Sequence, residues 1–126
     1  MQITAYQKYV RTTPRKLRLV ADAVRFMHPT KALSALQFMH KKAARDLKKV
    51  LNQAIKNAVN NNNLNQNDLK FKHILIEEGP RYKRFRSASR GRARQIQKKT
   101  SHIKIILENI EPKKIINKEK KTKNTK

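Results

Sequence analysis

The sequence predicts an α+β fold, in which three helices pack on a small three-stranded antiparallel sheet and a long β-hairpin protrudes from it. Three observations support this prediction. Apolar residues recur at helical spacing in three successive segments before residue 60. Strand-like runs occur once before these segments and twice after them, which favours helices grouped on one face of the sheet. The length of 126 residues suits one compact domain.

The first strand is expected over residues 2–12, as an edge strand or a partly covered one. Thr13 and Pro14 then begin a helix. The Thr13 side chain can accept hydrogen bonds from free N–H groups of the first turn, and Pro14 loses no bond at the first helical position. The apolar residues at helical spacing are Leu17, Val20, Ala21 and Val24. We expect this helix to end near residues 26–28, before Pro29.

Two more helices are expected before the period of the apolar residues changes. Thr30 is the candidate cap of a short second helix that ends near Met39. The third helix runs from about Lys41 to Asn60. Its continuous apolar stripe consists of Ala43, Ala44, Leu47, Val50, Leu51, Ala54, Ile55 and Ala58. The asparagine run 60–63 stops the helix, because Asn competes with helical hydrogen bonding and tolerates turns.

Two strands, over residues 71–76 and 103–107, flank a stretch of unusual composition. Residues 81–99 contain nine Lys or Arg, no acid and few large apolar groups. Such a stretch cannot form its own core, so we expect the flanking strands to continue outward as a two-stranded ribbon. The tip should lie at Ser87–Gly91, where small residues and a glycine permit reversal. About nine residues per arm give a projection of roughly 30 Å.

The domain prediction is a single globular domain over residues 1–111, which includes the extended hairpin at about 79–102. Residues 112–126 are rich in Lys and have little to bury, so a basic disordered tail is expected there. No apolar run approaches the roughly 20 residues that span a bilayer, and the N-terminus lacks a secretory h-region. An intracellular location without a membrane partner is therefore expected.

The charge of the chain predicts its partner. Lys and Arg number 32 against 8 acids, a formal charge of +24. Self-repulsion at this charge opposes a compact isolated chain. A polyanion would offset it, and nucleic acid fits best because neutralised phosphates release counterions. Arg supplies six of the nine cations in residues 81–99 and can grip phosphate with two hydrogen bonds. Tyr82 and Phe85 could stack on exposed bases.

Three groups of cations are candidate RNA contacts, with unequal support. The stretch 81–99 is the main one, since its charge density and lack of acids disfavour a plain solvated loop. The second group surrounds the start of the first helix, whose free N–H groups can also receive a phosphate. The third group lies on the third helix, where a solvated surface is an equally good explanation. Its members are Lys41, Lys42, Arg45, Lys48 and Lys49.

The sequence offers little for catalysis. The chain has no cysteine, and its four histidines show no metal-ligand spacing. Glu77 and Glu78 would point to opposite faces of a strand and make a poor acid/base pair. We therefore expect no enzyme, no metal and no cofactor. The alternatives are a free nucleic-acid chaperone or DNA-compacting protein, although no heptad seam for dimerisation is visible, and a small enzyme with a basic pocket.

Several short motifs occur in an order and spacing that are specific together. They are Tyr9–Arg11, Thr13–Lys16 and Asp22 near the start, Lys41–Ala44, Val50-Leu51 and Ala54–Ala58 in the long helix, Glu78–Pro80 at the hairpin entry, and Lys83–Arg86, Gly91–Ala93, Ile96 and Lys99–Ile103 in the hairpin and its return. Over about residues 5–108 the chain resembles the large-subunit ribosomal protein family L-twenty-two, in its bacterial and organellar form.

The resemblance implies a structural constituent of the large ribosomal subunit. Its domain would lie near the exit of the peptide tunnel, and its hairpin would reach inward to line the tunnel wall. The implied partners are large-subunit ribosomal RNA, whose domains it would bridge during assembly, neighbouring ribosomal proteins near the tunnel exit, and the nascent peptide at the tip. No homo-oligomer is expected. The location would be the cytoplasmic ribosome, with an organellar ribosome left open.

The candidate site residues follow from the positions of the cations and from the family resemblance. The expected ribosomal RNA ligands are Arg11, Arg15, Lys16, Arg18, Arg81, Lys83, Arg84, Arg86, Arg90, Arg92, Arg94, Lys98, Lys99, Thr100, Ser101 and His102. The expected tunnel tip consists of Ser87, Ala88, Ser89, Arg90 and Gly91. Phosphate contacts would position the protein, while the folded shape of the RNA would supply most of the specificity.

Overall fold

The computed structural model describes residues 1–110, so the tail predicted for residues 112–126 lies outside the described residues. The elements are β1 (Gln2–Val10), α1 (Pro14–Val24), α2 (Pro29–Phe38), α3 (Lys42–Asn62), a 3-10 turn (Gln66–Asp68), β2 (Leu69–Ser87), a second 3-10 turn (Ser89–Gly91) and β3 (Ala93–Asn109). Three helices thus separate the first strand from the other two, in the predicted order.

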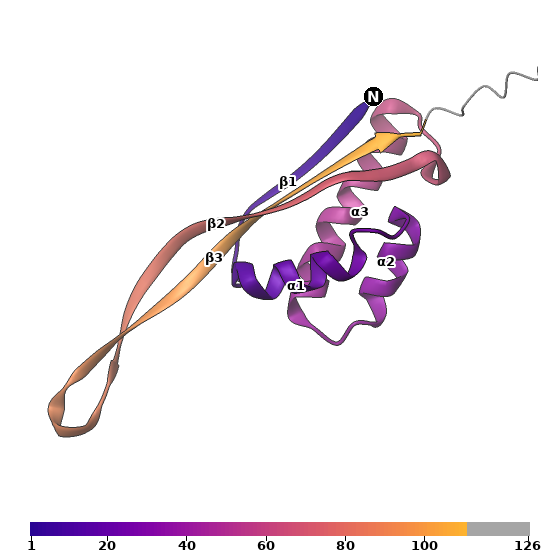
Figure 1. Ribbon diagram of the computed structural model, residues 1–126. Helices are drawn as coiled ribbons and strands as arrows, with labels where there is room; N and C mark the ends of the chain where they lie inside the picture. The colour runs from indigo at the N-terminus through magenta and orange to yellow at the C-terminus, as the bar shows by residue number, and fades with distance from the viewer. Residues whose placement is uncertain (111–126) are drawn as a thin grey trace, which may run out of the picture.

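The three strands form an antiparallel sheet in the order β1-β3-β2, so β3 is central and β1 lies at an edge. Ile105 of β3 lies opposite Ala5 of β1 on one side and Ile74 of β2 on the other. β1 ends at Val10, whereas β2 and β3 continue past it as a twisted ribbon that projects from the body (Figure 1). The predicted α+β class with a protruding hairpin is confirmed.

The hydrophobic core lies between the helices and one face of the sheet (Figure 1). All eight apolar residues of the stripe predicted for α3 are buried. Alternate residues of β3, namely Ile103, Ile105 and Leu107, are buried beneath the helices, as the period of two along a strand requires. The core ends where the ribbon begins, since every residue from 81 to 99 is exposed.

Two helix ends differ from the prediction. Thr30 was expected to cap the second helix, and this is wrong. α2 begins at Pro29 with His28 as the N-cap, whose side chain accepts a hydrogen bond from the Thr30 N–H. Proline suits the first helical position because its φ is fixed there and its missing N–H is no loss. The third helix runs two residues beyond Asn60 and ends where Asn63 adopts a left-handed conformation (φ 49°).

The start of α1 agrees with the prediction in position but not in its cap. Pro14 is the first helical residue and Thr13 the N-cap, yet the Thr13 side chain makes no capping hydrogen bond. The neighbouring Thr12 is buried instead, and its Oγ1 donates to Asp46 Oδ2 of α3 at 2.7 Å. This bond fixes the β1–α1 junction to α3.

The two adjacent threonines allow a matched test of this junction. Thr12→Val should lower the free energy of unfolding by about 1–3 kcal/mol, because it leaves a half-buried carboxylate oxygen without its donor. Thr13→Val removes a hydroxyl that caps nothing and should change it by less than about 0.5 kcal/mol. Urea unfolding followed by circular dichroism measures both. Equal effects would mean that the Thr12–Asp46 bond does not stabilise the fold.

Candidate nucleic-acid interface

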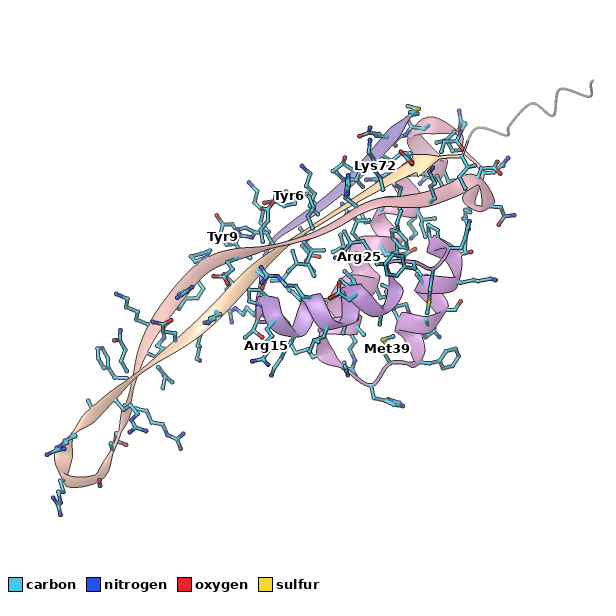
Figure 2. All side chains as sticks on the ribbon, in the orientation of Figure 1. Tyr6, Tyr9, Arg15, Arg25, Met39 and Lys72 are labelled. Carbon is cyan, nitrogen blue, oxygen red and sulfur yellow. The ribbon has the colours of Figure 1, made fainter. Side chains whose placement is uncertain are left out.

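The ribbon formed by residues 81–99 pairs continuously from Arg81 opposite Lys99 to Ser87 opposite Ala93. None of its side chains is buried, and they project into solvent along both arms (Figure 2). An isolated two-stranded ribbon is marginal in water, because hydrogen bonds alone do not offset the entropy of ordering the chain. The shape of the ribbon therefore needs a stabilising contribution from outside it.

The arrangement of the cations favours an anion as the source of that contribution. Arg86 lies directly opposite Arg94, and Arg81 directly opposite Lys99. Like charges placed opposite each other destabilise an antiparallel pair. Glu78 lies 2.9 Å from Arg81 and offsets part of the repulsion at that pair, whereas no Asp or Glu occurs between residues 79 and 107 to relieve the repulsion between Arg86 and Arg94. Phosphates lying between the paired cations would reverse its sign.

One ion pair marks the body end of the ribbon. Arg81 Nη2 donates to Glu78 Oε2 at 2.9 Å. This hydrogen bond, together with the charge of Arg81, lowers the pKa of Glu78 below its ordinary value. A lowered carboxyl pKa means that the pair is present at neutral pH and weakens only as pH falls through that pKa. Both side chains are about half exposed, so the effect on stability is small.

The reversal at the far end of the ribbon occurs where it was predicted. Ser87 and Ala93 form the last pair, and the Ala88 N–H donates to the Arg92 carbonyl at 2.7 Å. Arg90 (φ 57°) and Gly91 (φ 67°) both adopt left-handed conformations. Glycine adopts this conformation without strain, and it completes the turn here.

A bulge at Gly79-Pro80 joins the ribbon to the body. Glu78 lies opposite Ser101 and Arg81 opposite Lys99, so Gly79 and Pro80 together face Thr100. Thr100 Oγ1 donates to the Pro80 carbonyl at 2.7 Å. A Cβ at Gly79 would lie 2.5 Å from that same Oγ1, which explains the glycine. Bulges bend a strand, and this one sets the direction in which the ribbon leaves the sheet.

A double-mutant cycle tests this junction. Gly79→Ala should cost about 1–3 kcal/mol in the free energy of unfolding, because the buried Thr100 hydroxyl must give way. In a Thr100→Ala background the clashing oxygen is gone, so the same change should cost clearly less. Urea unfolding of the four proteins gives the coupling. Strict additivity would show that the two residues do not constrain each other.

Three consecutive predicted RNA ligands, Thr100, Ser101 and His102, have hydrogen-bond partners that hold the end of the ribbon to the body. Thr100 and Ser101 are buried, and Ser101 Oγ donates to the Thr12 carbonyl at 2.6 Å. His102 Nδ1 accepts from the N–H of Tyr9, which has a left-handed φ of 57°. The Tyr9 ring packs edge-on against His102 and projects from the sheet face that the helices leave uncovered (Figure 2). The sequence alone did not reveal these partners, because they depend on long-range register.

The second cation group, at the start of α1, and the third, on α3, meet the ribbon in one groove of about 900 Å³. It lies between the base of the ribbon and the N-terminal ends of α1 and α3. Its cations are Arg11, Lys16, Lys41, Lys42, Arg84, Lys98 and Lys99, and no acid among the described residues lines it. Lys41 and Lys42 were the weaker candidates in the sequence, and the structure places them beside the stronger ones. We refer to this feature as the basal groove.

The remaining candidates lie elsewhere. Arg15 is exposed on the first turn of α1 (Figure 2) but does not line the basal groove. Arg18 donates to the Ile76 carbonyl at 3.3 Å and lines a smaller, separate pocket. The outer arms and tip of the ribbon carry the other exposed cations, namely Lys83, Arg86, Arg90, Arg92 and Arg94.

The fold and the charge distribution together are typical of small structural proteins of ribonucleoprotein particles. Residues 5–108 match the family described as Ribosomal protein L22p/L17e. The Large ribosomal subunit protein uL22 of Mesoplasma florum is 45% identical over 107 residues, which cover 85% of this chain and 96% of that protein. The protein of the same name from Mycoplasma capricolum subsp. capricolum is 43% identical, with the same coverage.

The chain therefore belongs to the ribosomal protein L22p/L17e family, a family of structural, non-enzymatic constituents of the large ribosomal subunit. The resemblance found in the sequence is confirmed, and neither a DNA-compacting protein nor a small enzyme fits this membership. None of the helices among residues 1–110 is both long and apolar enough to cross a bilayer.

Proposed function

We propose that this constituent of the large subunit binds large-subunit ribosomal RNA through its ribbon and basal groove. It would bridge RNA segments during assembly and line the nascent-peptide tunnel with its tip. One observation carries the proposal: residues 81–99 form an ordered ribbon with nine cations, no acid and no buried side chain. Such a ribbon has no core of its own and is stable only where phosphates surround it.

Bridging is supported by the two faces of the ribbon. Directly paired residues share a face, and successive residues alternate. One face therefore carries Arg84, Arg86, Arg94 and Lys98, and the opposite face carries Arg81, Lys83 and Lys99. A ribbon that is cationic on both faces can bind one RNA segment on each face and so link the two segments. The predicted RNA ligands Thr100, Ser101 and His102 would contribute by holding the ribbon to the body.

The tip differs from the arms in a way that suits a tunnel wall. Ser87, Ala88, Ser89 and Gly91 are small, so they present little bulk to a passing peptide. Arg90 lies within this segment and Arg92 follows it, and these two cations can anchor the turn on RNA. The proposal also includes a cytoplasmic ribosome as the location and neighbouring ribosomal proteins near the tunnel exit as partners. Residues 1–111 would form a single domain.

Site-specific photocrosslinking in translating ribosomes tests the proposal. A photoreactive phenylalanine analogue at Phe85, on an arm of the ribbon, should crosslink to large-subunit RNA. At Ser89, in the tip, it should crosslink to the nascent chain. Phe38 lies exposed at the end of α2, away from the ribbon, and serves as the control position. A Phe85 probe that captured no RNA would refute the RNA-binding ribbon, and a Ser89 probe that captured no nascent chain would refute the tunnel tip.

A further inference from the structure

The basal groove combines charge with an apolar wall. Leu19 of α1 and Tyr82 of the ribbon line it, although they are 63% and 43% exposed. Large apolar side chains on an exposed cationic surface are not needed for phosphate binding, which takes place at the charged groups. Their presence indicates that the ligand has an apolar or aromatic part as well as negative charge.

The size and the aromatic ring of the groove narrow the choice of ligand. Its volume of about 900 Å³ lies within the range of about 300–1,000 Å³ typical of ligand pockets. The guanidinium of Arg84 lies 5.9 Å from the centre of the Tyr82 ring, so the ring and a cation are offered together. A nucleobase with its flanking phosphates has both matching parts.

We propose that the basal groove holds one unstacked nucleotide of a single-stranded RNA segment. The base stacks on Tyr82 against Leu19, and the flanking phosphates lie on cations of the groove such as Lys16 and Lys98. Bases inside a duplex cannot reach this surface, because their faces are already stacked. The inference rests on the proposed RNA binding and adds to it a site for a base.

The end of the groove where the ribbon meets the body is held in shape by the protein itself. Its floor includes Thr12, whose hydroxyl is bound to Asp46 and whose carbonyl accepts from Ser101 Oγ. The base of its ribbon wall is fixed by the bond from Thr100 to Pro80. These bonds join the β1–α1 junction, α3, β2 and β3 around the site. Because this end of the groove is preformed, binding there costs less entropy than binding along the ribbon, which its ligand must order.

Fluorescence of 2-aminopurine in a short RNA tests the inference on the full chain, because stacking on an aromatic ring quenches this base. The probe is a single-stranded RNA with one 2-aminopurine, compared with the same strand in a duplex. We expect quenching with the single strand only. Tyr82→Ala should abolish the quench and weaken single-strand binding about tenfold. Tyr82→Phe should keep both, since the ring remains.

Two further variants separate stacking from charge. Lys16→Gln should retain the quench but make the dependence of log affinity on log salt concentration shallower by about one. Phe38→Ala removes an exposed aromatic ring outside the groove and should leave binding and quench unchanged. Tyr82 is exposed and outside the core, so Tyr82→Ala should keep the circular dichroism spectrum of the parent chain.

The outcomes distinguish the inference from the function on which it rests. If Tyr82→Ala binds the single strand as tightly as the parent, or if the parent never quenches the probe, the nucleotide site is overturned while RNA binding stands. If the parent binds neither the single strand nor the duplex, the proposed RNA binding is overturned as well. Loss of the quench in Tyr82→Ala with retention in Tyr82→Phe supports the site.

Discussion

Replacing residues 84–96 with Asn-Gly is expected to remove most of the affinity for large-subunit RNA while leaving the body of the protein folded. Lys83 lies opposite Gln97, so a two-residue turn can close the shortened ribbon at that pair. The change deletes five arginines and no buried side chain. If each arginine neutralises one phosphate, the slope of log affinity against log salt concentration becomes shallower by about four.

Filter binding at several salt concentrations measures the slope, and circular dichroism measures the helices. A full-length chain with the five arginines replaced by glutamine is the matched control, because it keeps the length of the ribbon and loses the same charge. It should lose the same slope. Collapse of the helical signal in the shortened chain would refute a ribbon that is independent of the core, and an unchanged slope would refute phosphate binding by the arms.

A substitution in the core should have the opposite effect: it should lower the stability of the body, whereas a substitution on the ribbon should not. Ile105 lies on the central strand, and its side chain is fully buried. Ile105→Ala should therefore lower the free energy of unfolding by about 2–5 kcal/mol. Domains are typically stable by only about 5–15 kcal/mol, and a charge of +24 reduces that margin. The variant is therefore expected to be partly unfolded at low salt.

Ile96→Ala is the control for this substitution. It makes the same chemical change on the same strand, but Ile96 lies on the ribbon and is 39% exposed. Its effect should stay below about 0.5 kcal/mol. Urea unfolding of both variants gives the comparison. Similar losses at the two positions would mean that the ribbon and the body unfold as one unit, contrary to the separation described above.

The parts of the structure that follow from local patterns could be predicted from the sequence. The buried stripe of α3 depends on apolar spacing, and the turn around Gly91 depends on small residues within a strand-flanked stretch. Where two local signals competed, the prediction was wrong. Thr30 resembles a cap, but Pro29 takes the first helical position, so α2 begins closer to the N-terminus than predicted.

The parts that depend on contacts between distant segments could not be predicted. Lys16, Lys41 and Lys98 belong to three separate basic clusters in the sequence. Only the folded chain brings them into one groove. The buried hydroxyls of Thr100 and Ser101 likewise depend on how β3 meets Pro80 and the β1–α1 junction. In both cases, residue type gave the chemistry of a side chain and register decided its partner.

The pairing of β1 with β3 has a consequence for how the chain folds as it is synthesised. Gln2 lies opposite Glu108, so β1, which is synthesised first, can pair only after β3, the last strand among the described residues, has been synthesised. β2 and β3 are joined by a short turn and can pair locally, whereas docking β1 closes a loop of nearly the whole domain. We expect the hairpin to zip before the sheet is complete. The high contact order of β1 makes its docking the slow step.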